Sequence, residues 1–203
     1  MKLYYSAVSP YVRKIAIIAA ELGLKSSIEQ LPVSLSPYAP NPDVIALNPL
    51  GKIPVLETDD GALLYDSTVI AEYLLSIAPG SSLLPIEPKA RFETLTRASL
   101  ADGILDAAQA IRFETARPEG YCYPKWVEGQ QGKIVRGVAL FEKQPPKTFD
   151  LAAIGLCSTL AWIDLRIPDL DWRADAPRLA TWYEEISARP SVHETRFPQP
   201  IAA

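Results

Sequence analysis

The sequence predicts an α/β domain followed by an all-helical domain. Over the first 33 residues, a short strand, a helical stretch and a second strand follow one another. A hairpin signal and a further helix occupy residues 53–77, and after Pro88 only helical periodicity remains. Strands mixed with helices and then helices alone indicate two separately packed cores.

The opening strand–helix–strand unit follows from local patterns. Residues 2–5 form the first strand, and from Pro10 apolar residues recur at helical spacing until Gly23, a residue that commonly ends helices. Residues 28–33 alternate in character, as a second strand does, and residues 43–47 have room for one helical turn. The first domain therefore begins as β-α-β with a connector.

The stretch that follows predicts a turn and then a strand. Residues 48–51, Asn-Pro-Leu-Gly, have the composition of a turn. Pro54 stands at the start of the strand 53–57, where a proline is tolerated and where a cis peptide bond is a candidate. Such a bond would leave the backbone N–H and C=O of Val55 pointing outward, available to pair with an extended peptide.

A hairpin and a helix start complete this stretch. Asp60-Gly61 is a dipeptide that tolerates positive φ at both central positions, so it predicts a tight turn between residues 53–57 and 62–65. Helical periodicity then begins at Val69, which places Asp66 and Ser67 at a helix N-terminus. The unpaired N–H groups of a helix N-terminus attract carboxylates.

The second half of the chain has the pattern of a helical bundle. A proline- and serine-rich segment at 79–87 predicts a linker, which gives domains at residues 1–78 and 88–203. The proline-rich tail after residue 187 is expected to be loosely ordered. Four helices are expected, at residues 89–117, 124–144, 150–166 and 177–187.

Composition narrows the classes of function. A net charge of −4 without a Lys/Arg run argues against a nucleic-acid partner. Two cysteines, Cys122 and Cys157, and one histidine, His193, predict neither a disulfide framework nor a metal site. No apolar run is long enough for a membrane span or a signal peptide, so a cytoplasmic protein with no membrane association is expected.

Ser9 is the leading candidate for a functional side chain near the first helix. Serine followed by proline is what an N-cap with proline at the first helical position looks like, whatever the function. The Ser9 hydroxyl can also donate a hydrogen bond to an anion. Both interpretations stay open, and Tyr5 and Ser6 are alternative donors in the same loop.

The order of turn, Pro-Val strand, hairpin, Asp-Ser and helix resembles the glutathione-binding half of the glutathione S-transferase family. Residues 9–11, Ser-Pro-Tyr, stand where thioredoxin-like redox proteins carry Cys-Pro-Tyr, so the chain is most similar to bacterial serine-type members of the family. The resemblance implies a thioredoxin-like N-terminal domain and an all-α C-terminal domain. One departure is Lys147, where the family has a capping Ser or Thr before the central helix, so Thr148 is expected to cap instead.

The same resemblance implies the site. Ser9 would stabilise the glutathione thiolate, and Val55, preceded by Ile53 and Pro54, would hold the cysteinyl backbone. Further contacts are implied at the two ends of glutathione, from Lys52 to the glycine carboxylate and from Asp66 and Ser67 to the γ-glutamyl group.

By the same resemblance the protein is an enzyme, a cytoplasmic glutathione transferase that acts in detoxification on a small hydrophobic electrophile and forms a homodimer. Glutathione would be its co-substrate. The electrophile is expected between the domains, beside Ala7, Val8, Arg112 and Phe113. Open alternatives are a non-catalytic glutathione-binding or regulatory protein, and a glutathione-dependent isomerase, dehalogenase or peroxidase.

Overall fold

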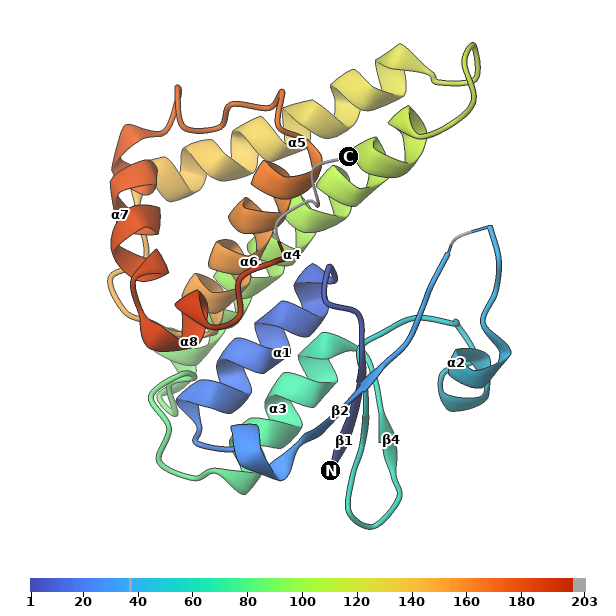
Figure 1. Cartoon of the computed structure of the whole chain (residues 1–203). Helices are drawn as coiled ribbons and strands as arrows, with labels where there is room; N and C mark the ends of the chain where they lie inside the picture. Colours follow the sequence, from blue (N-terminus) through green and yellow to red (C-terminus); the bar gives the residue numbers. More distant parts are fainter. Residues whose placement is uncertain (37, 199–203) are drawn as a thin grey trace. The chain divides into compact units, whose positions relative to one another are not determined.

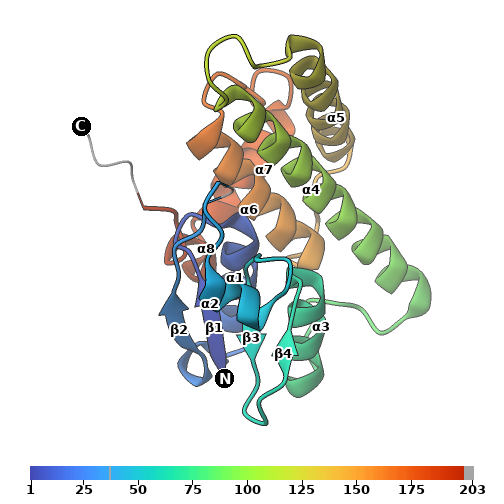
Figure 2. The same cartoon turned by 90° about the vertical axis from the view of Figure 1, so that its right-hand side faces the viewer.

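The structure is a computed structural model that describes residues 1–36 and 38–198; Pro37 and residues 199–203 lie outside the described part. The chain divides into two compact units, labelled by element in Figures 1 and 2. The first joins Met1–Ser82 to the segment that starts at Pro190, and the second is Leu83–Arg189. The predicted fold class, an α/β part and a helical part, is confirmed.

The first unit is built on a four-stranded sheet in the order β2-β1-β3-β4. β1 pairs in parallel with β2, while β3 pairs antiparallel with both β1 and β4. Figure 1 shows α1 and α3 on one side of these strands and α2 on the other. The strands are Lys2–Tyr5 (β1), Glu29–Pro32 (β2), Val55–Glu57 (β3) and Leu63–Leu64 (β4), and the helices are α1 (Pro10–Glu21), η1 (Lys25–Ser27), α2 (Pro42–Leu47), α3 (Ser67–Ile77) and α8 (Pro190–His193).

The second unit consists of four helices, α4 (Pro88–Thr115), α5 (Pro124–Lys143), α6 (Leu151–Arg166) and α7 (Pro177–Ser187). α6 is buried over most of its length and packs against α4, which also packs against α5. The predicted buried central helix is therefore confirmed. No helix of the described residues is long and apolar enough to cross a membrane.

Prolines set where the helices begin. Within the described residues, six of the eight α-helices start with a proline. Proline has its φ fixed near the helical value and lacks an N–H, which would have no intrahelical partner at this position. This is why helix starts could be predicted more closely than helix ends.

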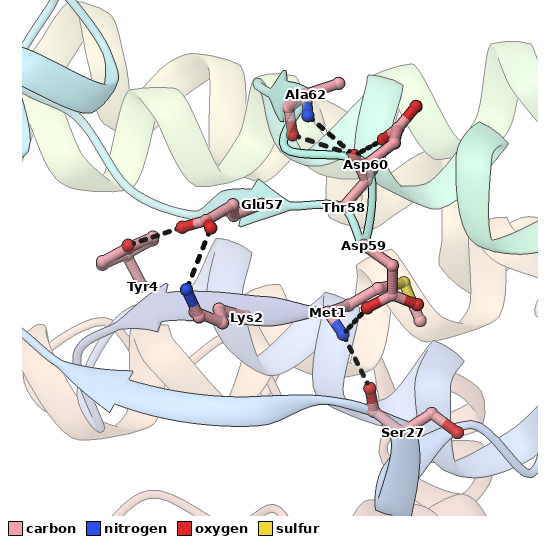
Figure 3. A network of polar contacts seen from close by, with 9 residues as sticks. All are labelled: Met1, Lys2, Tyr4, Ser27, Glu57, Thr58, Asp59, Asp60 and Ala62. Carbon is pink, nitrogen blue, oxygen red and sulfur yellow. Dashed lines mark hydrogen bonds and ion pairs between the residues drawn. The ribbon is translucent and has the colours of Figure 1, made fainter.

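The hairpin between β3 and β4 is wider than predicted. Thr58 N donates to Ala62 O at 2.9 Å and Gly61 N donates to Thr58 O at 3.0 Å, so the loop has three residues instead of two. Only Gly61 has positive φ, at 85°, and Asp60 does not. Instead, Asp60 accepts a hydrogen bond from the Thr58 hydroxyl, which lowers its pKa (Figure 3). This local bond favours the three-residue loop.

Residues 190–198 of the C-terminal tail form a defined segment against α1, contrary to the expectation of a loose tail, and residues 199–203 of that tail lie outside the described residues. After α7 the chain forms α8, and Ser191 Oγ donates a hydrogen bond to Glu21 of α1. Arg13, only 5% exposed, donates to the backbone oxygens of Thr195 at 2.9 Å and Val192 at 3.2 Å. These bonds tie the segment to α1, so it belongs to the first compact unit although the sequence suggested the helical one.

The start of the second unit also differs from the expected linker. Leu83 and Leu84 are buried, and Leu83 O accepts a hydrogen bond from Leu151 N at 2.9 Å. α6 is capped by Asp150, which accepts from Ala153 N at 3.0 Å. Thr148 is not the cap as expected; its hydroxyl donates to Asp150 at 3.0 Å and so supports the cap.

Candidate functional site

Ser9 caps the first helix, α1, and its role as thiolate donor stays a prediction. Its Oγ accepts a hydrogen bond from Val12 N at 3.4 Å, and its backbone oxygen accepts from Arg13 N at 3.0 Å. Accepting a bond leaves the hydroxyl proton of Ser9 able to donate. The side chain is half-buried, so the cap and a hydrogen bond to an anion at the N-terminus of α1 are compatible roles.

Asn48 holds the loop that leads to β3. Its side chain donates to Lys52 O at 3.0 Å and accepts from Leu50 N at 3.0 Å, and its backbone oxygen accepts from Gly51 N at 2.8 Å. Asn48 is 3% exposed. The sequence identifies Asn48 only as part of a turn. Its hydrogen bonds that hold the loop together become visible only in the structure.

The start of β3 has the backbone features on which the predicted binding edge depends. The Ile53–Pro54 peptide bond is cis, as predicted, and the Tyr65–Asp66 bond is cis as well. Val55 is paired with Tyr4 of β1, whereas the β4 ladder pairs only with Leu56 and Glu57. The edge of Val55 on the β4 side therefore has no ladder partner within the described strands, and an extended peptide can pair with it.

Asp66 and Ser67 begin α3, as predicted. Asp66 is the N-cap, and its Oδ1 accepts from Thr68 N at 2.9 Å. Asp66 is exposed while Ser67 is buried. A carboxylate and a hydroxyl beside the positive end of a helix can bind an ammonium and a carboxylate side by side.

Sheet topology brings these groups to one end of the sheet. Ser9 follows the C-terminal end of β1, Val55 is the first residue of β3, and Asp66 follows β4. Because β3 is antiparallel to both β1 and β4, its first residue lies beside the last residues of those strands. Three segments distant in sequence thus meet at one end of the sheet.

The alternative thiolate donors line the same pocket. Tyr5, Ser6, Ala7 and Ser9 all line a pocket of about 300 Å³ within the first unit. Ala7 and Val8 are exposed. The lining does not separate Ser9 from Tyr5 or Ser6, because all three contribute to it.

The other predicted residues lie elsewhere. Arg112 is half-buried and Phe113 is 47% exposed, both near the end of α4 in the second unit, and their contact with an electrophile stays a prediction. Lys52 is exposed and Ile53 half-buried, directly before the buried Pro54. The described residues contain no group of three or more His, Cys, Asp or Glu side chains that could hold a metal ion.

A charged network joins β1 and β3 (Figure 3). Glu57 accepts from Lys2 Nζ at 2.9 Å and from the Tyr4 hydroxyl at 2.8 Å. Two hydrogen bonds lower the pKa of Glu57, and the one from Lys2 has a larger effect than the one from Tyr4. The bond that Tyr4 donates to Glu57 also raises the pKa of Tyr4. The hydroxyl of Tyr4 is thus hydrogen-bonded to Glu57 on the neighbouring strand.

Comparison with known proteins agrees with this geometry. The model of the glutathione S-transferase N-terminal domain matches residues 8–77, and that of the glutathione S-transferase C-terminal domain matches residues 124–185. An uncharacterized GST-like protein of Escherichia coli (strain K12), YibF, is 32% identical over 207 residues, covering 98% of this chain and 100% of its own.

Solved structures show the same likeness in three dimensions over nearly the whole chain. A glutathione transferase family member from Pseudomonas fluorescens Pf-5, crystallised with bound glutathione, has a TM-score of 0.93 at 43% identity and covers 97% of this chain and 98% of its own. A glutathione S-transferase from Methylobacillus flagellatus KT with glutathione bound has a TM-score of 0.86 at 37% identity, over 96% and 98%. Sequence, fold and site geometry together lead to one conclusion: the chain belongs to the glutathione S-transferase family.

Proposed function

We propose that the protein is a glutathione transferase that binds reduced glutathione at the end of the sheet and transfers it to a small hydrophobic electrophile. The observation that supports this best is the meeting of Ser9, the Val55 edge and the Asp66–Ser67 helix start at one end of the sheet. Structures similar to this chain that are crystallised with glutathione support the same ligand.

Each part of glutathione has a partner of suitable chemistry. The backbone N–H and C=O of Val55 pair with the cysteinyl residue, in the orientation that Ile53 and Pro54 give the strand. Ser67 and the first N–H groups of α3 bind the γ-glutamyl carboxylate, and Asp66 binds the ammonium group. Lys52 reaches the glycine carboxylate.

Ser9 has the task of stabilising the thiolate. A free thiol with a pKa of about 8.5 is roughly 3% ionised at pH 7, and a decrease of about two pKa units makes most of it thiolate. That decrease corresponds to roughly 2.7 kcal/mol. One hydrogen bond to a charged group contributes about 1.5–3 kcal/mol, so the Ser9 hydroxyl and the positive end of α1 are sufficient.

Substitution of Ser9 tests this role. Ser9→Ala removes both the donor and the cap, whereas Ser9→Thr keeps a hydroxyl and serves as the matched control. The thiol pKa of bound glutathione is measured from its thiolate absorbance during a pH titration. We expect Ser9→Ala to raise that pKa by one to two units, on the order of the lost hydrogen bond, and Ser9→Thr to change it little.

An unchanged thiol pKa in Ser9→Ala, with glutathione still bound, would exclude Ser9 as the donor. The same titration of Tyr5→Phe and Ser6→Ala then tests the two alternative donors.

The same thiolate can begin other reactions, so assays should include isomerisable substrates, halogenated compounds and hydroperoxides beside simple electrophiles. A protein that binds glutathione and turns over none of them would be the non-catalytic or regulatory alternative. Action in detoxification, a cytoplasmic location and a homodimer are also part of the proposal. A sedimentation mass equal to one chain would contradict the dimer.

A further inference from the structure

The segment 190–198, which follows α7, contacts α1 near both ends of the helix, and we call it the C-terminal strap. Ser191 Oγ donates to Glu21 at the end of α1, whereas two backbone oxygens of the strap accept from Arg13 near its start. Figure 1 shows the strap running along α1 toward the N-terminal end of the helix. Because Arg13 comes about one turn after Ser9, the strap holds α1 close to the candidate thiolate donor.

Arg13 makes several contacts with the strap at once. Its Nε donates to Thr195 O at 2.9 Å, its Nη2 donates to Val192 O at 3.2 Å, and its guanidinium carbon lies 5.1 Å from the centre of the Phe197 ring. The residue is only 5% exposed. A planar guanidinium holds its donors in a fixed geometry, and hydrogen bonds from a charged group are the strong ones. Arg13 therefore fixes both the distance and the direction between the start of α1 and the strap.

The contacts at the other end of α1 are weaker. Lys25 pairs with Glu194 at 2.7 Å, but the two side chains are 63% and 56% exposed, and exposed ion pairs contribute little. Ser191 makes a single hydrogen bond to Glu21. The strap thus holds α1 most firmly at the end that carries Ser9.

The backbone links the position of Arg13 to that of Ser9. Arg13 N donates to Ser9 O at 3.0 Å, the first backbone bond of α1, and Val12 N donates to Ser9 Oγ at 3.4 Å. Helix ends fray, and a cap bond of 3.4 Å is longer than the usual range, so the cap alone holds this end weakly. A fixed Arg13 side chain keeps the first turn of α1, and with it the Ser9 hydroxyl, in one place.

We propose that Arg13 is a positioning residue of the glutathione transfer: by binding the C-terminal strap, it holds the Ser9 hydroxyl in the orientation that stabilises the thiolate. This inference rests on the proposed role of Ser9. Burial of a cation costs free energy that a well-packed apolar side chain would avoid, so stability alone does not favour arginine here. A hydrogen bond depends steeply on distance and angle, so a small movement of the start of α1 raises the thiol pKa while glutathione still binds.

Arg13→Lys tests the positioning, because it keeps the charge and loses the planar fork. The thiol pKa of bound glutathione is measured from its thiolate absorbance during a pH titration, together with unfolding in denaturant. We expect Arg13→Lys to raise the thiol pKa by about half a unit to one unit, less than the loss of the hydroxyl itself. Ser191→Ala, which loosens the same strap at the far end of α1, is the matched control; it should lower the unfolding midpoint and leave the thiol pKa unchanged. An unchanged thiol pKa in Arg13→Lys, or an equal increase in Ser191→Ala, overturns the inference.

A double-mutant cycle shows whether Arg13 acts through Ser9. In the Ser9→Ala background, Arg13→Lys should raise the thiol pKa no further, because no hydroxyl is left to position. An equal increase in both backgrounds means that Arg13 acts on the thiolate by another route, and overturns the inference. Phe197→Leu removes only the ring next to the guanidinium and keeps the test available if Arg13→Lys does not fold. It should raise the thiol pKa by a smaller amount, and no increase counts against the inference.

The failure of this inference can be told apart from that of the proposed function. A wild type that binds no glutathione overturns the proposed function and the inference with it. An unchanged thiol pKa in Ser9→Ala overturns the assignment of the donor, on which the inference depends. A thiol pKa that responds to Ser9→Ala but not to Arg13→Lys overturns the inference alone.

Discussion

Asp66 has one observed role and one proposed role, and a pair of substitutions can separate them. In the structure its carboxylate caps α3 by accepting from Thr68 N at 2.9 Å. In the proposed complex the same carboxylate binds the ammonium group of glutathione. Asparagine caps a helix about as well as aspartate, so Asp66→Asn removes the charge and keeps the cap, while Asp66→Ala removes both.

The expected magnitudes follow from exposure. Asp66 is exposed, so its attraction to an ammonium group is screened and contributes about 1 kcal/mol, not the larger value of a buried pair. Loss of that attraction weakens glutathione binding about fivefold. Loss of the cap lowers the free energy of unfolding by about 1 kcal/mol.

Calorimetry and denaturant unfolding of both variants measure these quantities. We expect Asp66→Asn to bind glutathione about fivefold more weakly with its stability nearly unchanged, and Asp66→Ala to show the same weakening together with the loss of stability. The effect on binding should shrink at high salt. If Asp66→Asn binds glutathione like the wild type at low salt, the charge of Asp66 does not hold the ligand and the reasoning is wrong.

Two further predictions concern the scaffold. Gly137 of α5 packs against α4 so closely that an added Cβ would lie 2.6 Å from Ile104 Cδ1, so Gly137→Ala should cost about 1–3 kcal/mol in unfolding free energy despite its better helix propensity. An added Cβ at Gly129 in the same helix would meet nothing within 4 Å, so Gly129→Ala should instead raise the free energy of unfolding by up to about 1 kcal/mol. Equal effects of Gly137→Ala and Gly129→Ala in denaturant unfolding would contradict the packing argument. The pKa of Glu57 is lowered from its ordinary 4.5, chiefly by the hydrogen bond from Lys2, so its contribution to stability is complete above pH 4.5 and is lost as the pH falls through the lower folded value. Unfolding of the wild type and Glu57→Gln at several pH values should therefore show a difference that disappears in acid; a difference independent of pH would count against the network.

Local chemistry made much of the fold predictable. The start of α3 at Asp66–Ser67 and the cis bond before Pro54 depend on neighbouring residues, so both could be predicted from the sequence. The three-residue hairpin was missed because the φ of Asp60 depends on a bond from Thr58, which competes with the turn preferred by Asp-Gly.

Long-range contacts set the limit of prediction. α8 has only four residues and is held by bonds to α1, such as that from Ser191 to Glu21, which are 170 positions apart. The alanines of α1 likewise resemble ordinary core residues in the sequence. Their exposure to a pocket appears only once β1, β2 and the C-terminal segment are placed around the helix.

The discontinuity of the first unit affects the order in which the chain can fold during synthesis. Domains usually fold from the N-terminus onward as the ribosome makes them. Here Arg13 is made early, but the two carbonyls that accept its hydrogen bonds, those of Val192 and Thr195, are made after the whole helical unit. The nascent α/β part must therefore keep a cationic side chain hydrated until Val192 and Thr195 emerge, and the helical unit is the first that the ribosome can complete.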